Sequence, residues 1–275
     1  MAEAKADNTY RLVVFNPPDD PPAVRDLLVG VTGIHPTDAM RWVARTPGIW
    51  PQPLAEGEVR ELLDGLFDLG VPAEAWRIDL LPDLSPPRTI HDGACLPDGF
   101  RVKGLRGEPT HWVPWDKIEL ISAGRITLED EYRDVTPRGW ASALATGFSA
   151  MIGRAPRFTR RARAMRIPRD PVGELLIVRK DPRLAFRVVE NQMKYAYLGD
   201  RLRLSASENF PLLLADLCAR AESAYITPST RALLEHGNAP DYEFPSSLAL
   251  LEYTTHRLLW SWYRRDRDSQ MKTDQ

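Results

Sequence analysis

The chain has 275 residues and a mass of 31.1 kDa, which gives room for one large domain or two ordinary ones. Its hydrophobic fraction of 43% and charged fraction of 27% argue against long disorder or a fibrous repeat, and its net charge of −2 excludes a protein that is basic throughout. Two cysteines, Cys95 and Cys218, are too few for a disulfide framework, and no apolar run predicts a signal peptide or a transmembrane segment, so we expect a soluble, cytoplasmic protein.

The first third of the chain has a regular pattern of elements. In chain order it predicts a strand over residues 10–15, a helix from Pro22 to Gly33, a short helix from Pro36, a helix that ends at Gly70 and a strand over 71–78. The third helix is expected to bury one apolar face, formed by Val59, Leu62, Leu63, Leu66 and Phe67. The order strand, helix, helix, helix, strand is that of a small α+β sandwich.

The residues that mark the turns and helix ends of this region carry a family resemblance. The sequence TGIHPTDA over 32–39, Pro47, the helix start at 56–59 and LGVPA over 69–73 follow one another at matching positions. Together they resemble the C-terminal domain of the ribosomal stalk protein, whose fold is shared by the Clp protease adaptor that recognises N-degrons. The likeness covers about residues 9–80, so it implies a protein-binding α+β sandwich there and nothing about the rest.

The resemblance also implies places to look for a partner site. The stalk domain binds translation factors through lysines on its second helix, whereas this segment has His35, Asp38 and Arg41 and no lysine. The Clp adaptor holds a substrate's α-amine with Asn and Asp side chains after its first strand. In the present sequence prolines interrupt that motif, and the histidine that follows the adaptor's second helix is absent. The residues in the similar place are Asn16, Asp19 and Asp20. Asp20 has an alternative interpretation as the N-cap of the helix begun by Pro21 or Pro22.

The remainder reads as a second module. The proline-rich stretch Leu81–Arg88 is typical of a stiff linker, so we place the domains at 1–84 and 85–275. Strands are predicted over 100–105, 111–113, 118–122, 174–179, 184–189 and 193–198, and a helix over 211–221. Six strands and one closing helix resemble, in element order, a pleckstrin-homology-like β-barrel, here with a helical insertion over 134–172 and C-terminal helices.

The insertion is the most distinctive segment. Its apolar residues Trp140, Leu144 and Phe148 recur at helical spacing and form a candidate partner-binding stripe. Seven arginines follow within 16 positions, with no acid among them: Arg154, Arg157, Arg160, Arg161, Arg163, Arg166 and Arg169. Because guanidinium groups suit phosphate and carboxylate, this stretch is a candidate anion site for acidic lipid or nucleic acid.

Two other interpretations of the insertion stay open. Residues 1–137 carry a net charge of −9 and residues 138–275 a net charge of +7, so the basic stretch has an acidic surface within its own chain to dock on. The plainer alternative is a solvated segment whose apolar stripe covers the barrel.

The C-terminal helix is expected to pack on its own domain. Leu248, Leu251, Leu258 and Trp262 line one predicted face, Leu259 and Trp260 widen it, and Arg264, Arg265 and Arg267 end it. A groove for a partner is the alternative.

The sequence has no catalytic or metal-binding motif. The five histidines are scattered and no phosphate loop or nucleophile elbow is present. His91 and Asp92 near Cys95 could serve as a base and nucleophile, but a small buried cysteine in a turn is the simpler interpretation. We therefore predict a non-enzymatic adaptor with an unidentified protein partner and no cofactor or metal. The alternatives are an anionic-ligand binder and, ranked lowest, an enzyme without a recognisable motif.

Overall fold

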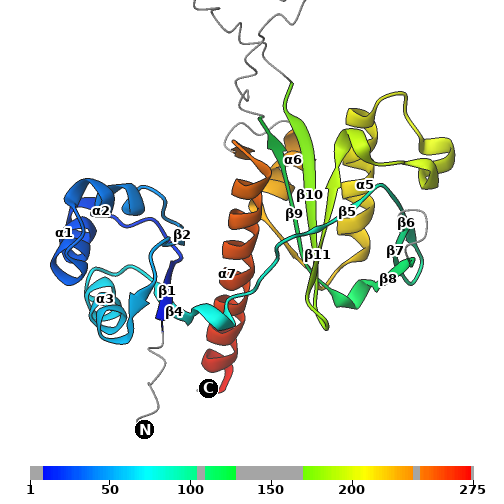
Figure 1. The fold of residues 1–275 in the computed structure, drawn as a ribbon. Helices are drawn as coiled ribbons and strands as arrows, with labels where there is room; N and C mark the ends of the chain where they lie inside the picture. Colours follow the sequence, from blue (N-terminus) through cyan, green and yellow to red (C-terminus); the bar gives the residue numbers. More distant parts are fainter. Residues whose placement is uncertain (1–8, 104–108, 128–169, 238–241, 274–275) are drawn as a thin grey trace, which may run out of the picture.

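One long helix stands between two units that each mix helices and strands (Figure 1). The computed structural model describes residues 9–103, 109–127, 170–237 and 242–273. The first unit lies on one side of helix α7 (Ser247–Thr273), and the second unit lies on the other. The expected α+β class is therefore confirmed.

The first unit contains the predicted strand, three helices and strand, together with two very short strands. Its elements are β1 (Thr9–Val14), α1 (Pro21–Thr32), α2 (Pro36–Val43), β2 (Gly48–Ile49), β3 (Leu54–Ala55), α3 (Glu56–Asp68), β4 (Ala73–Arg77) and the 3₁₀ turn η1 (Ile78–Leu80). Strand β1 is central, and β2, β3 and β4 all pair with it in antiparallel fashion. The three helices cover one face of this sheet (Figure 1).

Local sequence signals fix the ends of the helices. The Oδ1 atom of Asp20 accepts a hydrogen bond from the backbone N–H of Ala23 at 3.1 Å, which confirms the N-cap interpretation. Gly33 ends α1 in the left-handed region, at φ +68°, as its position predicted. The expected inward position of Phe67 is wrong, because its side chain is 82% exposed; Leu66 and Leu62 fill the core and the next residue along the helix points away from it.

Strand β1 is buried on both faces. Leu12 and Val14 belong to the core beneath the helices of the first unit, whereas Val13 and Phe15 belong to a cluster with Leu259 of α7. Alternating side chains of a strand point to opposite faces, so a strand without polar alternation needs a cover on each side. Helix α7 provides the second cover.

The second unit is built on an open sheet. Its strands run β12–β9–β10–β11–β5, and β13 also pairs with β9. Their bounds are β5 (Arg88–Ile90), β9 (Ile118–Ile126), β10 (Val172–Arg179), β11 (Leu184–Val189), β12 (Tyr225–Ile226) and β13 (Glu243–Phe244). Helices α5 (Ala206–Arg220) and α6 (Pro228–His236) pack on one face, and α7 packs on the other. A small antiparallel sheet of β6 (Asp92–Leu96), β7 (Gly99–Lys103) and β8 (His111–Pro114) adjoins the same core.

Two expectations for the second unit are wrong. The sheets of the described residues do not close into a barrel, because each strand order is open at both ends. A helical layer covers each face of the larger sheet instead. Residues 193–198 do not form a strand: their end lies in the 3₁₀ turn η4 (Ala196–Arg201). The two tyrosines that suggested a strand are instead held by separate hydrogen bonds. The hydroxyl of Tyr195 donates to the carbonyl oxygen of Glu190 at 2.8 Å, and that of Tyr197 donates to Asp216 at 3.0 Å.

Helix α7 packs on its own domain, as expected, but it also packs on the first unit, which was not expected. Leu258 faces the second sheet and Leu259 faces the first. Leu248, expected on the buried face, is 62% exposed near the start of the helix, and Leu250 is buried in its place. The proline-rich stretch before β5 also contacts this helix, since Leu84 is buried in the cluster that contains Leu258.

Candidate functional site

The predicted site residues fall in two groups. Asn16, Asp19 and Asp20 lie exposed in the loop between β1 and α1, where Asp20 is occupied as the helix cap. The arginine stretch and the apolar stripe lie outside the described residues; they are Trp140, Leu144, Phe148, Arg154, Arg157, Arg160, Arg161, Arg163, Arg166 and Arg169. The structure therefore leaves the apolar and arginine sites as predictions.

The candidate base and nucleophile residues around Cys95 have separate partners. His91 Nδ1 lies 3.3 Å from the carbonyl oxygen of Gln192, and Asp92 forms an ion pair with Lys103 at 3.6 Å. Burial raises the pKa of Cys95 to about 12, so its thiol is protonated near neutral pH. Cys95 lies in strand β6 rather than in a turn.

A groove runs along helix α2 at the surface of the first unit. We call it the α2 groove; it has a volume of about 470 Å³ and is lined mainly by His35, Asp38, Arg41, Trp42, Arg45 and Gln52. The residues come from α2 and the loops at its two ends, because Pro36 begins the helix and the chain turns back into β2. Of these residues, the sequence drew attention to His35, Asp38 and Arg41; Trp42, Arg45 and Gln52 were missed.

The α2 groove combines an aromatic ring with exposed charge. Arg41 Nη1 pairs with Asp38 Oδ1 at 2.9 Å across one helical turn. Arg45 makes no ion pair with any residue that the structure describes. The Trp42 ring is partly buried and tilts against the buried Trp50, with 6.2 Å between ring centroids. The groove therefore offers a fixed aromatic wall beside a guanidinium group that is free to bind.

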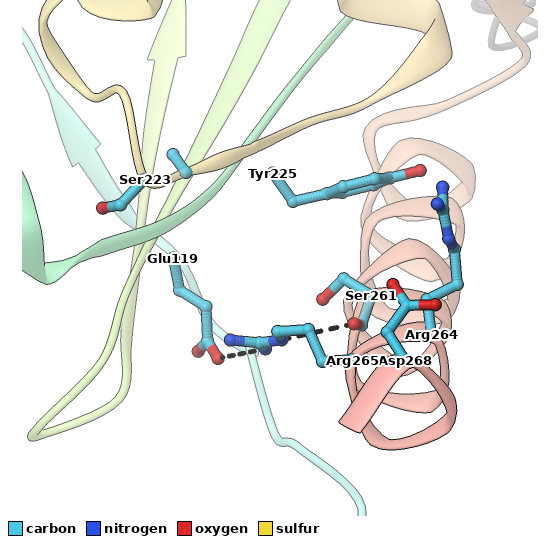
Figure 2. A pocket seen from close by; sticks show the side chains of 8 residues that line it. Glu119, Ser223, Tyr225, Ser261, Arg264, Arg265 and Asp268 are labelled. Atoms are coloured by element: carbon cyan, nitrogen blue, oxygen red, sulfur yellow. Dashed lines mark hydrogen bonds and ion pairs between the residues drawn. The ribbon is translucent and has the colours of Figure 1, made fainter. Parts of the chain in front are cut away.

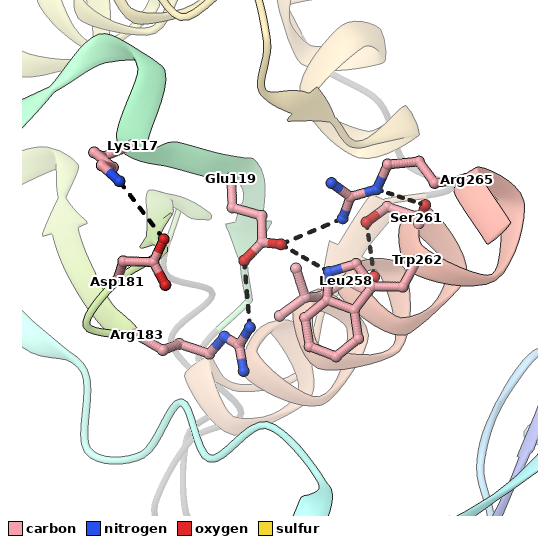
Figure 3. Close-up of polar contacts among 8 residues, drawn as sticks. All are labelled: Lys117, Glu119, Asp181, Arg183, Leu258, Ser261, Trp262 and Arg265. Carbon is pink, nitrogen blue, oxygen red and sulfur yellow. Dashed lines mark hydrogen bonds and ion pairs between the residues drawn. The ribbon is translucent and has the colours of Figure 1, made fainter. Parts of the chain in front are cut away.

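A second polar centre forms around Glu119, where the second sheet meets α7 (Figure 3). The side chain of Glu119 is only 8% exposed. Its Oε1 accepts from Trp262 Nε1 at 2.7 Å and from Arg265 Nη2 at 3.3 Å, and Arg183 Nη2 lies 3.7 Å from Oε2. A buried carboxylate needs such donors, because leaving it unpaired away from water is strongly unfavourable.

The Glu119 cluster reaches both units. The Arg183 guanidinium lies over the Trp262 ring, 4.6 Å from its centroid, and the same ring is a tilted neighbour of Trp76 of β4, at 5.7 Å between centroids. Trp76 belongs to the first sheet, and Arg183 to the turn before β11. Trp262 therefore contacts the first unit and the second unit at once.

A hollow opens beside this cluster (Figure 2). We call it the Glu119 hollow; it has a volume of about 290 Å³, and its polar lining is Glu119, Ser223, Tyr225, Ser261, Arg264, Arg265 and Asp268. The sequence analysis interpreted these arginines as a helix end and missed the hollow. A signal was present, since residues 261, 264, 265 and 268 follow the i, i+3, i+4, i+7 spacing of one helical face.

No family model, curated protein or solved structure matches the chain. In the described ranges no group of three or more His, Cys, Asp or Glu side chains is placed to hold a metal ion. None of the described helices combines the length and the apolar content needed to cross a membrane.

Proposed function

We propose that the protein is a cytoplasmic, non-enzymatic adaptor whose first unit binds a protein partner through the α2 groove. The observation that carries the proposal is the groove itself, in which the partly buried Trp42 of α2 lies beside the exposed Arg45 of the loop that follows the helix. Tryptophan and arginine are the residue types that most often dominate binding energy at protein interfaces.

The burial of the first sheet favours the helical side as the binding surface. One face of that sheet is covered by α1, α2 and α3 and the other by α7, so no sheet face remains for a partner. The resemblance to the ribosomal stalk domain also supports α2, because the second helix is the partner-binding helix of that family. The different side chains at this position, His35, Asp38 and Arg41 in place of lysines, favour a partner with different surface chemistry.

The proposal predicts that reversing the charge of Arg45 weakens partner binding. A photo-crosslinking amino acid at Gln52 of the full chain should form a covalent adduct with the partner in source cells, which identifies it. The Arg45→Glu variant should then bind the purified partner at least about tenfold more weakly, the effect expected for an arginine at the centre of an interface.

Arg60→Glu provides the matched control, because Arg60 is an exposed arginine on α3 whose ion pair with Glu56 is a surface contact of small energy. We expect this variant to bind normally. Equal weakening by both substitutions would show a general effect of charge, and an unaffected Arg45→Glu variant would remove the groove from the proposal.

The second candidate function is binding of an anionic ligand through the stretch from Arg154 to Arg169. Strands β9 and β10 are paired over their length, and Ile126 lies opposite Val172, so the two ends of the intervening segment start side by side. An insertion at such a point can engage a ligand without disturbing the sheet. We propose acidic phospholipid or single-stranded nucleic acid as the ligand, since both present phosphate groups to guanidinium.

Charge reversal at the centre of the arginine stretch tests the second candidate. The triple variant Arg160→Glu, Arg161→Glu, Arg163→Glu should lose about a hundredfold in affinity for phosphatidylserine vesicles or an oligonucleotide, from ~1 kcal/mol for each cation removed. Sedimentation and fluorescence anisotropy at low and high salt measure the two ligands separately. The same charge change at Arg60, Arg77 and Arg101 serves as the control, and equal loss in both variants contradicts a specific site.

A further inference from the structure

The Glu119 hollow contains charged groups that no part of the described chain uses. The side chains of Arg264 and Asp268 form neither a hydrogen bond nor an ion pair with any described residue, and the same holds for the hydroxyls of Ser223 and Tyr225. Figure 2 shows these groups around one opening, with Tyr225 on one side and the α7 side chains on another. Arg264 and Asp268 are both exposed, so their charged groups are accessible to a ligand that enters the hollow.

Some charged groups of the Glu119 hollow are paired within the protein, and others remain available to a ligand. Glu119 is bonded to Trp262 and Arg265 and lies beside Arg183, so its negative charge is balanced within the protein. Arg265 donates from Nε to the carbonyl oxygen of Ser261 at 3.2 Å and from Nη2 to Glu119, which leaves its Nη1 group free of hydrogen bonds to the described residues. The groups that remain available are therefore the Arg264 guanidinium, the Nη1 group of Arg265 and the Asp268 carboxylate.

This combination selects against a simple ion. A plain anion that approached Arg264 and Arg265 would meet Asp268, and a plain cation that approached Asp268 would meet both arginines. A molecule that carries a carboxylate and an ammonium group satisfies all three, with the carboxylate on the guanidinium side and the ammonium on the Asp268 side.

The size and walls of the hollow narrow the class further. A volume of about 290 Å³ is at the lower end of the range for small-molecule sites. Ala224 and the ring of Tyr225 add an apolar wall next to the charged groups. We propose that the Glu119 hollow binds a zwitterionic α-amino acid, whose side chain packs against Tyr225.

Isothermal titration calorimetry on the full chain tests this proposal. Each of the twenty free L-amino acids is titrated separately, and the strongest binder is then compared with its N-acetyl and C-terminal amide derivatives. We expect one molecule bound per chain and at least about tenfold weaker binding of each derivative, because each lacks one of the two charges. No binding by any amino acid, or equal binding by the blocked derivatives, overturns the proposal.

Four variants on one helix locate the site. Arg264→Gln and Asp268→Asn should each weaken binding about tenfold, since each removes one charged partner. Asp266→Asn and Arg267→Gln are the matched controls, because both residues are exposed on α7 and neither lines the hollow. Unchanged affinity in Arg264→Gln and Asp268→Asn, or equal loss in the controls, contradicts the assignment. None of these results depends on the α2 groove.

Discussion

Replacing Phe15 by alanine is expected to lower the free energy of unfolding by ~3–5 kcal/mol, the range for deleting a buried aromatic side chain. Phe15 is 2% exposed and directly follows β1, the strand that faces α7. Its ring stacks on Tyr263, with 4.4 Å between centroids, and lies 5.4 Å from Trp260 and 6.0 Å from His256. The substitution removes the centre of the contact between the first sheet and the long helix.

Urea unfolding followed by circular dichroism measures this loss. Phe67→Ala is the matched control, since it deletes the same side chain from an exposed position in the same unit and should change the stability by no more than about 0.5 kcal/mol. A Phe15→Ala protein as stable as the Phe67→Ala protein would contradict the packing of β1 on α7. Without α7 the first unit would expose Val13, Phe15 and Trp76, so only the full chain keeps this surface covered.

The stability of the protein is expected to fall between pH 7 and pH 5 by about 2 kcal/mol through His256 alone. Burial lowers the pKa of His256 from 6.5 to about 4, and the charge of the neighbouring Arg257 acts in the same direction. The Nε2 atom lies 3.0 Å from the carbonyl oxygen of Val14, which only accepts, so Nε2 carries the proton of the neutral ring.

The direction of this pH effect follows from the protonation of His256 in the folded and the unfolded chain. Above pH 6.5 the ring is neutral in both the folded and the unfolded chain, and His256 contributes no pH dependence. As the pH falls from 6.5 towards 4, the unfolded chain takes up a proton that the folded chain does not, so unfolding becomes easier. Below about pH 4 both states are protonated and the effect stops growing.

Substitution by glutamine isolates this contribution. Gln can present an amide N–H to Val14 without titrating, so His256→Gln should lose about 2 kcal/mol less than the natural chain between pH 7 and pH 5 in urea unfolding. His236→Gln changes an exposed histidine and should keep the full pH dependence. The assignment fails if the natural chain and His256→Gln lose the same stability over this range.

Local signals in the sequence predicted most of the first unit. Asp20, Gly33 and Pro36 each determine a helix end through their own side chain or backbone, so neighbouring residues suffice to locate them. The strand at Leu184–Val189 was also predicted with its observed bounds. Helix α6 was missed although Thr227 caps it and Pro228 begins it, because its short apolar pattern is weak.

What the sequence could not show is how distant elements meet. The helical period of α7 was recognised, but the pattern of Leu258, Leu259 and Trp262 does not show how many sheets the helix packs against. The Glu119 hollow joins residues more than a hundred positions apart, and the bond between Glu119 and Trp262 spans 143 positions. Such a site depends on the tertiary fold, whereas His35 and Arg41 of the α2 groove are the N-cap and a residue of one short helix.

The shared helix has a consequence for biosynthesis. Val14 and His256 are separated by 242 positions, so the first strand leaves the ribosome long before the helix that covers its second face. At a translation rate of ~5–20 residues per second, the apolar side of β1 remains uncovered for roughly 10–50 seconds. During translation the nascent first unit therefore presents an uncovered apolar strand surface, which is prone to aggregation until the last helix emerges.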